Sequence, residues 1–214
     1  MAQIKINKTW LIYGAMALGA VLLTLYVIIP LLRKWLMKTQ HIIQQALTVR
    51  ALDVEQQYGL QLLVEEFVKR GDGDKRKLAY ILATVAHESN FRAIKEKRGK
   101  TGSYAYEQQQ KYWDTGYYGR GFIQLTWKSN YEKFSRILGV DLVNNPDKAL
   151  DPKIAAQIAV QGMIQGFFTG KKLSDYFNYV EADWINARRI VNADVSRNGK
   201  SIGDLAQRYY KAIK

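Results

Sequence analysis

The 214-residue sequence contains no cysteine and only two histidines, His41 and His87. The missing cysteines exclude disulfide cross-links and thiolate metal ligands, and two histidines are too few for a histidine-based zinc site. The stretch "AHESNF" also lacks the second histidine of an H-E-x-x-H metalloprotease helix. We therefore expect neither a metal nor a cofactor.

Acidic residues are also scarce: 19 Asp and Glu stand against 32 Lys and Arg, and the formal net charge is +13. Such a chain is attracted to polyanions, whether nucleic acid, anionic lipid or an anionic cell wall. The basic residues are mostly scattered, and no zinc-finger spacing, basic region with heptads or RNA-binding signature accompanies them. A solvated basic surface is the simplest interpretation, and nucleic acid is not an expected partner.

Charge is missing altogether from one long stretch, "WLIYGAMALGAVLLTLYVIIPLL" at residues 10–32. A helix needs roughly 20 apolar residues to cross a bilayer, and Trp10, Tyr13 and Trp35 stand where interfacial aromatic residues are expected. A cleaved signal peptide would have a shorter apolar core and a small-residue cleavage site, and a buried soluble helix would carry a polar stripe. We predict one transmembrane helix in a single-pass membrane protein; the flanking charges leave its orientation open.

The rest of the chain predicts a tail at residues 1–9, a stalk or linker helix at 33–50 and a globular domain at 51–214. Apolar residues at helical spacing, with capping residues around them, make this domain mostly α. Residues 91–117 show no helical period and are predicted to be a loop. The following "YYGRGFIQLTW" predicts a turn with a small β element, in which Gln124 and Thr126 share one strand face.

Two carboxylates stand out within the globular domain. Glu88 ends an otherwise apolar helix, and Glu96 follows eight positions later. On one continuous helix they would be about 12 Å apart, whereas the acid and base of an inverting glycosidase are roughly 6.5–9.5 Å apart. The two form a catalytic pair only if the helix ends after Asn90 and the chain folds back.

The two carboxylates lie within a series of motifs that runs from about Leu78 to Asn192. In order they are "ILATVAHESNF", "IKEKRG", "YYGRGFIQLTWKSNYEKFSRILGVDL", "NPDKALDP" and "ARRIVN". This series resembles the family 19 glycoside hydrolases, the chitinase family whose bacterial and phage members include endolysins. The resemblance implies a lysozyme-like, two-lobed, mostly helical fold with a small β element. It also implies inverting hydrolysis of β-1,4 links between N-acetylated sugars.

The resemblance also assigns roles to particular residues. Glu88 matches the general acid, Glu96 matches the general base of the shorter members, and Thr126 matches the hydroxyl residue that helps to hold the attacking water. The positions that contact sugar correspond to Gln124, Asn130 and Asn192.

Elementary electrostatics is compatible with the two main roles. An apolar wall of Val85 and Phe91 would disfavour the charged form of Glu88, as an acid requires, while the basic neighbours of Glu96 would favour its charged form. Two alternatives stay open. Glu88 could be a core carboxylate paired with Arg92, Arg188 or Arg189, and Glu107 is a rival for the role of base.

Four further residues are candidate substrate contacts: His87, Tyr118, Arg120 and Trp127. Three of them have a structural alternative. His87 could be a packed helix residue, Arg120 could serve only the glycine-containing turn, and Trp127 could be a core aromatic residue.

The loop around the carboxylates is short and basic, which favours anionic peptidoglycan over chitin. The predicted function is therefore a membrane-anchored peptidoglycan hydrolase, similar to a muramidase or endolysin, in a bacterial membrane or a phage virion membrane, with its catalytic domain facing the wall. Its expected partners are peptidoglycan strands, the lipid bilayer through residues 10–32, and other virion or envelope proteins. Alternatives are a lytic transglycosylase, a chitinase, or an inactive tether between membrane and wall.

Overall fold

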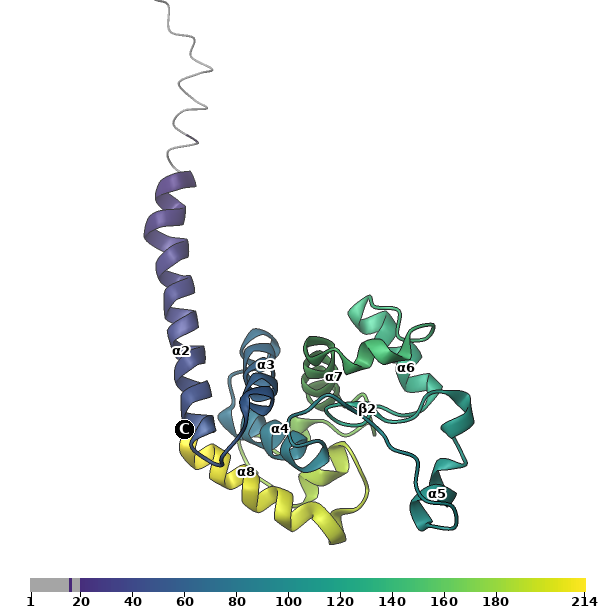
Figure 1. Cartoon of the computed structure of the whole chain (residues 1–214). Coiled ribbons are helices and arrows are strands. Elements are labelled where there is room, and N and C mark those ends of the chain that lie inside the picture. The colour runs from purple at the N-terminus through teal and green to yellow at the C-terminus, as the bar shows by residue number, and fades with distance from the viewer. Residues whose placement is uncertain (1–15, 17–19) are drawn as a thin grey trace, which may run out of the picture. The chain divides into compact units, whose positions relative to one another are not determined.

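The computed structural model describes residue 16 and residues 20–214 of the chain. The chain divides into two compact units, Met1–His41 and Ile42–Lys214. Figure 1 shows the path of the chain, coloured from the N-terminus to the C-terminus. The predicted tail at residues 1–9 lies outside the described residues.

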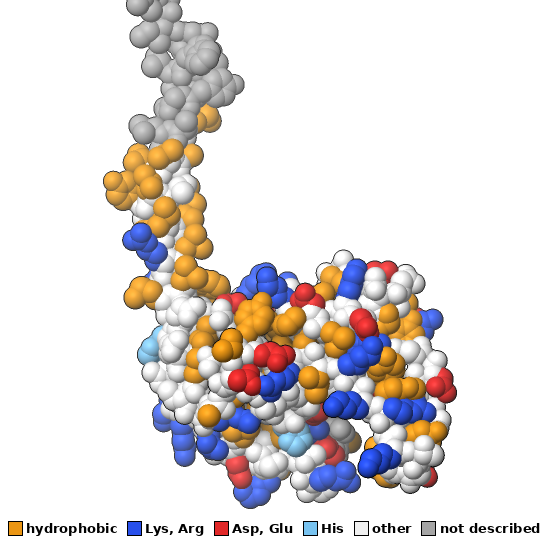
Figure 2. All heavy atoms as spheres, in the orientation of Figure 1, with side chains coloured by type: hydrophobic (Ala, Val, Ile, Leu, Met, Phe, Trp, Pro, Cys, Tyr) orange, Lys and Arg blue, Asp and Glu red, His pale blue; other side chains and the backbone are white. Residues whose placement is uncertain are grey.

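An apolar helix near the N-terminus includes the second half of the predicted span at 10–32, of which the first half is described only at residue 16. This helix, Ala20–Leu47, has 28 residues; its most apolar 18-residue window has a mean hydropathy of 1.7, and none of that window is buried. Its exposed apolar side chains are visible in Figure 2. A π-helical turn, η1 (Thr24–Ile28), precedes α2 (Ile29–Leu47), close to a proline that lacks a backbone donor. The helix is long and apolar enough to cross a membrane, and a signal sequence has the same properties.

The second unit is mostly helical, as predicted. Its α-helices are α3 (Val54–Arg70), α4 (Lys75–Glu88), α5 (Tyr104–Gln109), α6 (Lys128–Leu138), α7 (Pro152–Gln165) and α8 (Lys200–Ile213). Two strands, β1 (Ile94–Lys95) and β2 (Arg120–Gly121), pair antiparallel. Shorter helical turns are η2 (Trp113–Thr115), η3 (Pro146–Leu150), η4 (Leu173–Asp175), η5 (Asn186–Ile190) and η6 (Val195–Gly199).

Side-chain caps place the helix starts where the sequence predicts them. Asp53 and Gln56 form a reciprocal capping box at the start of α3, with bonds of 2.9 and 3.0 Å. Asp74 caps α4, and Asp151 caps α7 through the amides that follow it. Helix α6 ends at Gly139, whose φ of 66° is one that glycine adopts readily.

The prediction of a continuous loop at residues 91–117 is wrong in two places. Ser103 accepts a hydrogen bond from the Tyr106 amide and starts the short helix α5, and η2 follows it. A six-residue helix is too short for its apolar period to be visible in the sequence. In addition, the segments around Ser174 and at 182–192 form only short 3-10 turns.

The predicted strand face is also wrong. Strand β2 covers two residues, and the chain then turns back so that Leu125 forms a bridge with Arg120. Gln124 and Trp127 have left-handed φ angles of 53° and 76°, which breaks the alternation that a strand requires. After Gly121, a turn and not the alternation of a strand therefore sets the direction of each side chain.

The core of the second unit surrounds α4. This helix packs against α8, and α3 packs against α7; Figure 1 shows these four helices grouped together, with β2, α5 and α6 beside them. Ten consecutive residues of α4, from Lys77 to Ala86, are buried. Glu88 therefore lies at the end of an almost fully buried helix.

The compact second unit begins before the predicted boundary at residue 51. Ile42 and Ile43 are 5% and 4% exposed and Ala46 is fully buried, and all three belong to the same apolar core as α4. The last turns of α2 therefore contribute to the globular domain.

Candidate active site

The chain folds back directly after Glu88, as the catalytic pair requires. Helix α4 ends at Glu88, and Asn90 and Phe91 both adopt left-handed backbone angles, with φ of 52° and 62°. This reversal leads into β1, which pairs with β2 so that Lys95 lies opposite Arg120. The sequence after the helix is therefore returned to the "GRG" turn.

A cleft of about 360 Å³ opens beside this reversal. Six of the ten predicted site residues line it: Glu88, Gln124, Thr126, Trp127, Asn130 and Asn192. Its apolar lining includes Ile123, Phe168 and Val191. The cleft therefore combines residues from the end of α4, the turn after β2, the start of α6 and the segment after η5.

Glu88 forms an ion pair with Arg188, one of the three partners proposed from the sequence. Nη1 of Arg188 donates to Oε1 of Glu88 at 2.5 Å, and the side chains are 3% and 18% exposed. Oε2 of Glu88 has no hydrogen bond within residues 20–214. Arg92, another proposed partner, instead binds Asp53 and Glu55. Glu88 is thus both ion-paired and part of the cleft.

Asp194 completes the group around Arg188, and the sequence analysis missed it. Nε and Nη2 of Arg188 donate to the Asp194 carboxylate at 2.6 and 3.3 Å, and Asn198 donates to it at 2.6 Å. Burial acts to raise the pKa of Asp194, but the hydrogen bonds from Arg188 and Asn198 lower it below its ordinary value of 3.8. Arg188 is therefore a charged donor that fixes one oxygen of Glu88.

Glu96 is held by three donors, none of them charged. Gln109 Nε2 and the Tyr112 hydroxyl donate to Oε1 at 2.9 and 2.8 Å, and the Gly119 amide donates to Oε2 at 2.8 Å. Burial and the hydrogen bond to Glu96 raise the pKa of Tyr112, so its hydroxyl stays a donor. A carboxylate has about four acceptor positions, which leaves one for a ligand.

Gly119 connects Glu96 to the cleft wall. A Cβ atom at Gly119 would lie 2.8 Å from Oε1 of Gln124 and 3.1 Å from Oε2 of Glu96. The two side chains therefore flank one glycine, and any larger residue would displace them. Gln124 and Thr126 line the cleft itself, and the Thr126 hydroxyl donates to the Gln124 carbonyl at 2.9 Å. That bond leaves the lone pairs of Thr126 available to accept from water.

A stack of aromatic and guanidinium groups braces the loop between Glu96 and Gly119. It consists of Tyr106, Arg98, Trp113, Tyr118 and Arg120. The Arg98 guanidinium carbon lies 4.8 Å from both neighbouring ring centroids, the Trp113 and Tyr118 rings stack at 4.4 Å, and Arg120 lies 4.1 Å over Tyr118. Such cation–π contacts stabilise the loop that carries two donors to Glu96.

Arg120 binds the backbone of the glycine-containing turn, which was the structural alternative for this residue. It is 4% exposed, donates to Asp147 at 2.7 Å, and donates to the carbonyls of Gly116 and Tyr118 at 2.9 and 3.1 Å. Its hydrogen bond is the main cause of the lowered pKa of Asp147. Arg120 therefore holds the backbone that leads into Gly119 and does not line the cleft.

Trp127 and His87, two other candidate substrate contacts, differ in their position relative to the cleft. Trp127 is 46% exposed, lines the cleft and contacts the edge of the Tyr112 ring, with centroids 5.2 Å apart. His87 is exposed in the last turn of α4 and does not line the cleft. Trp127 is therefore exposed at the cleft and is not a core residue, while His87 lies outside the cleft lining.

The sequence analysis also missed Gln109 and Tyr112, the side chains that hold Glu96. Both lie in the run "YEQQQKYW", within the predicted loop at 91–117. Ser103 was the available signal, because it is a favoured helix N-cap. The helix that starts there ends at Gln109, and a turn closed by the bond from the Tyr112 amide to the Gln109 carbonyl follows it. Both side chains can therefore donate to one carboxylate oxygen.

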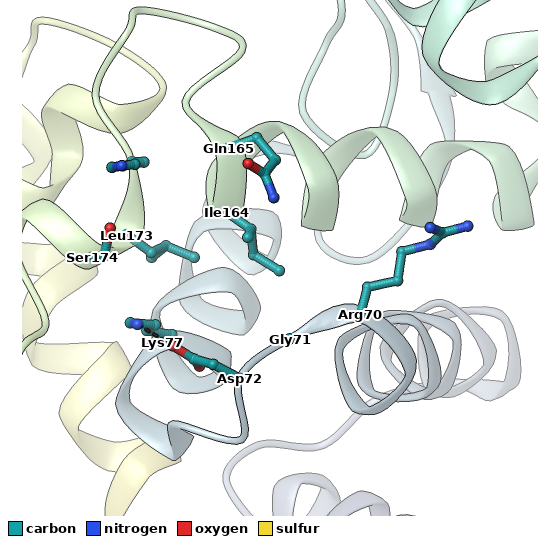
Figure 3. A pocket seen from close by; sticks show the side chains of 9 residues that line it. Arg70, Gly71, Asp72, Lys77, Ile164, Gln165, Leu173 and Ser174 are labelled. Carbon is teal, nitrogen blue, oxygen red and sulfur yellow. Dashed lines mark hydrogen bonds and ion pairs between the residues drawn. The ribbon is translucent and has the colours of Figure 1, made fainter.

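A separate hollow of about 330 Å³ shares no lining residue with the cleft. Figure 3 shows it where the end of α3, the start of α4 and the end of α7 come together. Lys77 and Asp72 form an ion pair in its wall, and Arg70 and Ser174 also line it. None of the predicted site residues lies in this hollow.

Part of the chain matches a known protein family. Residues 66–168 match the family model Glyco_hydro_19, described as chitinase class I, and this region contains Glu88, Glu96 and Thr126. Chitinase 5 of Oryza sativa subsp. japonica is 30% identical over 159 residues, which is 67% of this chain and 49% of that protein. The acidic 27 kDa endochitinase of Solanum lycopersicum is 33% identical over 87 residues, 40% of this chain and 35% of that protein.

The fold is similar to that of a solved protein structure. Chitinase C from Streptomyces griseus HUT6037 superposes with a TM-score of 0.56 at 22% identity, covering 79% of this chain and 90% of that one. The resemblance to the family 19 glycoside hydrolases is confirmed, and the second unit has the mostly helical fold of a family 19 chitinase. The chain spans between about a third and a half of the length of the two plant relatives.

Proposed function

We propose that the protein is a membrane-anchored glycoside hydrolase that cleaves β-1,4 bonds between N-acetylated sugars in peptidoglycan. The observation that carries this proposal is the placement of Glu88 in the lining of a cleft, with Glu96 outside that lining but beside Gly119, next to the cleft residue Gln124. Glu88 lies in the lining with one free oxygen, and Glu96 is fixed beside the Gly119 backbone with one acceptor position left.

In the proposed reaction, Oε2 of Glu88 donates a proton to the glycosidic oxygen while the bond from that oxygen to the sugar carbon breaks. A water molecule attacks the same carbon from the opposite face, and Glu96 takes the proton that the water loses. The water becomes the new hydroxyl of the reducing end, with inverted configuration. Thr126 accepts the second hydrogen of the water and so directs a lone pair at the carbon.

The neutral donors around Glu96 suit the role of base. They stabilise the carboxylate form without a cation, which would make the carboxylate a weaker base. By contrast, Arg188 fixes Oε1 of Glu88 and so leaves Oε2 as the oxygen that carries the proton. The exposed Trp127 offers a ring face on which a sugar can pack.

Support for the substrate and the location comes from charge and hydropathy. A net charge of +13 favours an anionic wall polymer over neutral chitin. The apolar helix Ala20–Leu47 supports a membrane anchor. Chitin is the second candidate substrate, because the relatives of this chain are chitinases.

The test is digestion of purified peptidoglycan, and of chito-oligosaccharides in parallel, by the full chain in detergent. Mass analysis of the fragments distinguishes hydrolysis, which gives reducing ends, from transglycosylation, which gives anhydro sugars. Glu88→Gln is the control, because it removes the proton and keeps the shape; we expect its rate to fall by at least about 10²-fold. Anhydro products, or an active Glu88→Gln protein, would contradict the proposed mechanism.

A further inference from the structure

A basic loop runs beside the proposed base. Residues 95–111 contain five basic side chains, Lys95, Lys97, Arg98, Lys100 and Lys111, and only two acidic ones, Glu96 and Glu107. Within residues 20–214, only Lys95 of these five forms an ion pair, with Asp147 at 3.2 Å. Four cationic groups in the loop therefore have no carboxylate partner in the described part of the chain.

This basic loop adjoins the cleft. It contains Glu96 itself, and it carries Gln109, which donates to the Glu96 carboxylate. Directly after the loop, Tyr112 donates to Glu96 and packs against Trp127, which lines the cleft. Lys97 and Lys100 are exposed and stand one and four residues after Glu96. Their charges therefore add to the positive potential of the loop that carries Glu96.

Arg98 adds a fixed donor to the same loop. Its guanidinium lies between the Tyr106 and Trp113 rings, at 4.8 Å from each centroid. Its Nη1 atom is buried and has no hydrogen-bond partner within residues 20–214. A buried guanidinium nitrogen normally has an acceptor, and a carboxylate is the acceptor whose geometry it matches best.

We propose that residues 97–111 form a subsite for carboxylates on the peptide stems that branch from the glycan strand. Chitin is uncharged along its whole length, whereas peptide stems carry free carboxylates at regular intervals. The loop binds these carboxylates through Lys97, Arg98 and Lys100 and so selects strands that carry acidic branches. This inference rests on the proposed glycoside hydrolase function and names the feature of the substrate that the basic loop recognises.

The test compares one glycan with and without its charge. The full chain in detergent is assayed on native peptidoglycan, on the same peptidoglycan after carbodiimide amidation of its carboxylates, and on neutral chito-oligosaccharides. The test variant is Lys97→Gln/Lys100→Gln, because both side chains are exposed and neither forms a hydrogen bond within residues 20–214. The matched control is Lys69→Gln/Lys211→Gln, which removes two exposed charges from α3 and α8.

We expect the loop variant to lose about three- to tenfold in rate on native peptidoglycan, and less than about twofold on the two uncharged substrates. The control variant should match the wild type on all three. The loss should disappear in about 0.5 M salt, where exposed charges are screened.

Equal losses on native and amidated peptidoglycan, or a loop variant that behaves like the control, would overturn the subsite. A wild-type protein that digests native and amidated peptidoglycan at the same rate would also overturn it, while leaving the proposed function intact. If the wild type cleaves chito-oligosaccharides and neither form of peptidoglycan, the proposed substrate is wrong and the subsite falls with it.

Discussion

The two carboxylates of the site differ in how the protein holds them. A buried, charged arginine binds Glu88, and Asp194 in turn fixes that arginine. Glu96 is bound by an amide side chain, a hydroxyl and a backbone N–H group. Oε2 of Glu88 has no partner within residues 20–214, and Glu96 keeps one acceptor position, so in the proposed reaction both can exchange protons without rearrangement of their own partners.

The identity of the base can be tested with two single variants. Glu96→Gln should lose at least about 10²-fold in rate on the glycan substrate, because the amide cannot take a proton from water. Glu107→Gln should lose little, because Glu107 is exposed on α5 and forms no ion pair in the described chain. Initial rates of reducing-end release measure both. The opposite ranking of the two variants would transfer the role of base to Glu107.

Asp194 predicts a pH-dependent contribution to stability. Its native pKa is lowered below 3.8, so its ionised form stabilises the fold fully above that value, and the contribution is lost as the pH falls through the native pKa. Asp194→Asn should therefore lower the melting temperature at pH 7, and the difference from the wild type should shrink progressively below pH 3.8.

Thermal unfolding of the full chain in detergent, followed at several pH values, measures this difference. Asp114→Asn is the control, because Asp114 is exposed and forms no ion pair within residues 20–214. A destabilisation by Asp194→Asn that stays constant down to pH 2 would show that the carboxylate charge is not what Arg188 requires.

At the scale of elements, the reversal after α4 depends on a close approach to α3. A Cβ atom at Gly59 would lie 2.1 Å from the carbonyl oxygen of Phe91 and 3.2 Å from the Phe122 ring. Phe91 is fully buried in a left-handed conformation, so it has little freedom to move away. Gly59 is therefore required for the turn that separates the helix of Glu88 from the strand before Glu96.

We expect Gly59→Ala to lower the free energy of unfolding by about 1–3 kcal/mol, because the added methyl group overpacks the contact. Helix propensity alone would favour alanine by about 1 kcal/mol. The sign of the change in the free energy of unfolding therefore distinguishes overpacking from helix propensity. Chemical denaturation measures it, with Lys69→Ala on the exposed side of α3 as the control. A stabilised Gly59→Ala protein would mean that the two segments are not in contact.

At the scale of the whole molecule, the two ends of the apolar helix differ in burial. Its N-terminal part is exposed and apolar, whereas Ile42, Ile43 and Ala46 belong to the core of the second unit. The position of a truncation should therefore decide whether a folded domain results.

A chain that starts at Lys38 should be soluble without detergent and keep its activity, because it retains the buried residues of α2. A chain that starts at Ala51 should be less stable by about 3–6 kcal/mol, because it loses two buried isoleucines. That is a large share of the typical 5–15 kcal/mol that stabilises a domain. Fractionation, activity and denaturation of the two chains measure these differences. Equal stability of both would show that the end of α2 does not contribute to the core.

Local rules were sufficient to predict the long helices, whereas the two carboxylates were singled out by the resemblance to a known family. Capping residues and apolar spacing predicted α3, α4, α6 and α7, because these signals act within one turn of the chain and need no distant partner. The order of the motifs around Glu88 and the "GRG" turn indicated the family and the cleft residues Gln124, Thr126 and Asn130.

Only the tertiary structure decided how those carboxylates are held. Arg188 binds Glu88 across a hundred residues, and Asp194 binds Arg188. The sequence offered three arginines as partners of Glu88, and spacing alone could not select one of them. Gln109 ends a helix too short to show a period, Tyr112 follows in the next turn, and cation–π stacking fixes the loop that carries both. Arg120 had two interpretations in the sequence, and burial selected one, since a buried guanidinium must bind the acceptors that surround it.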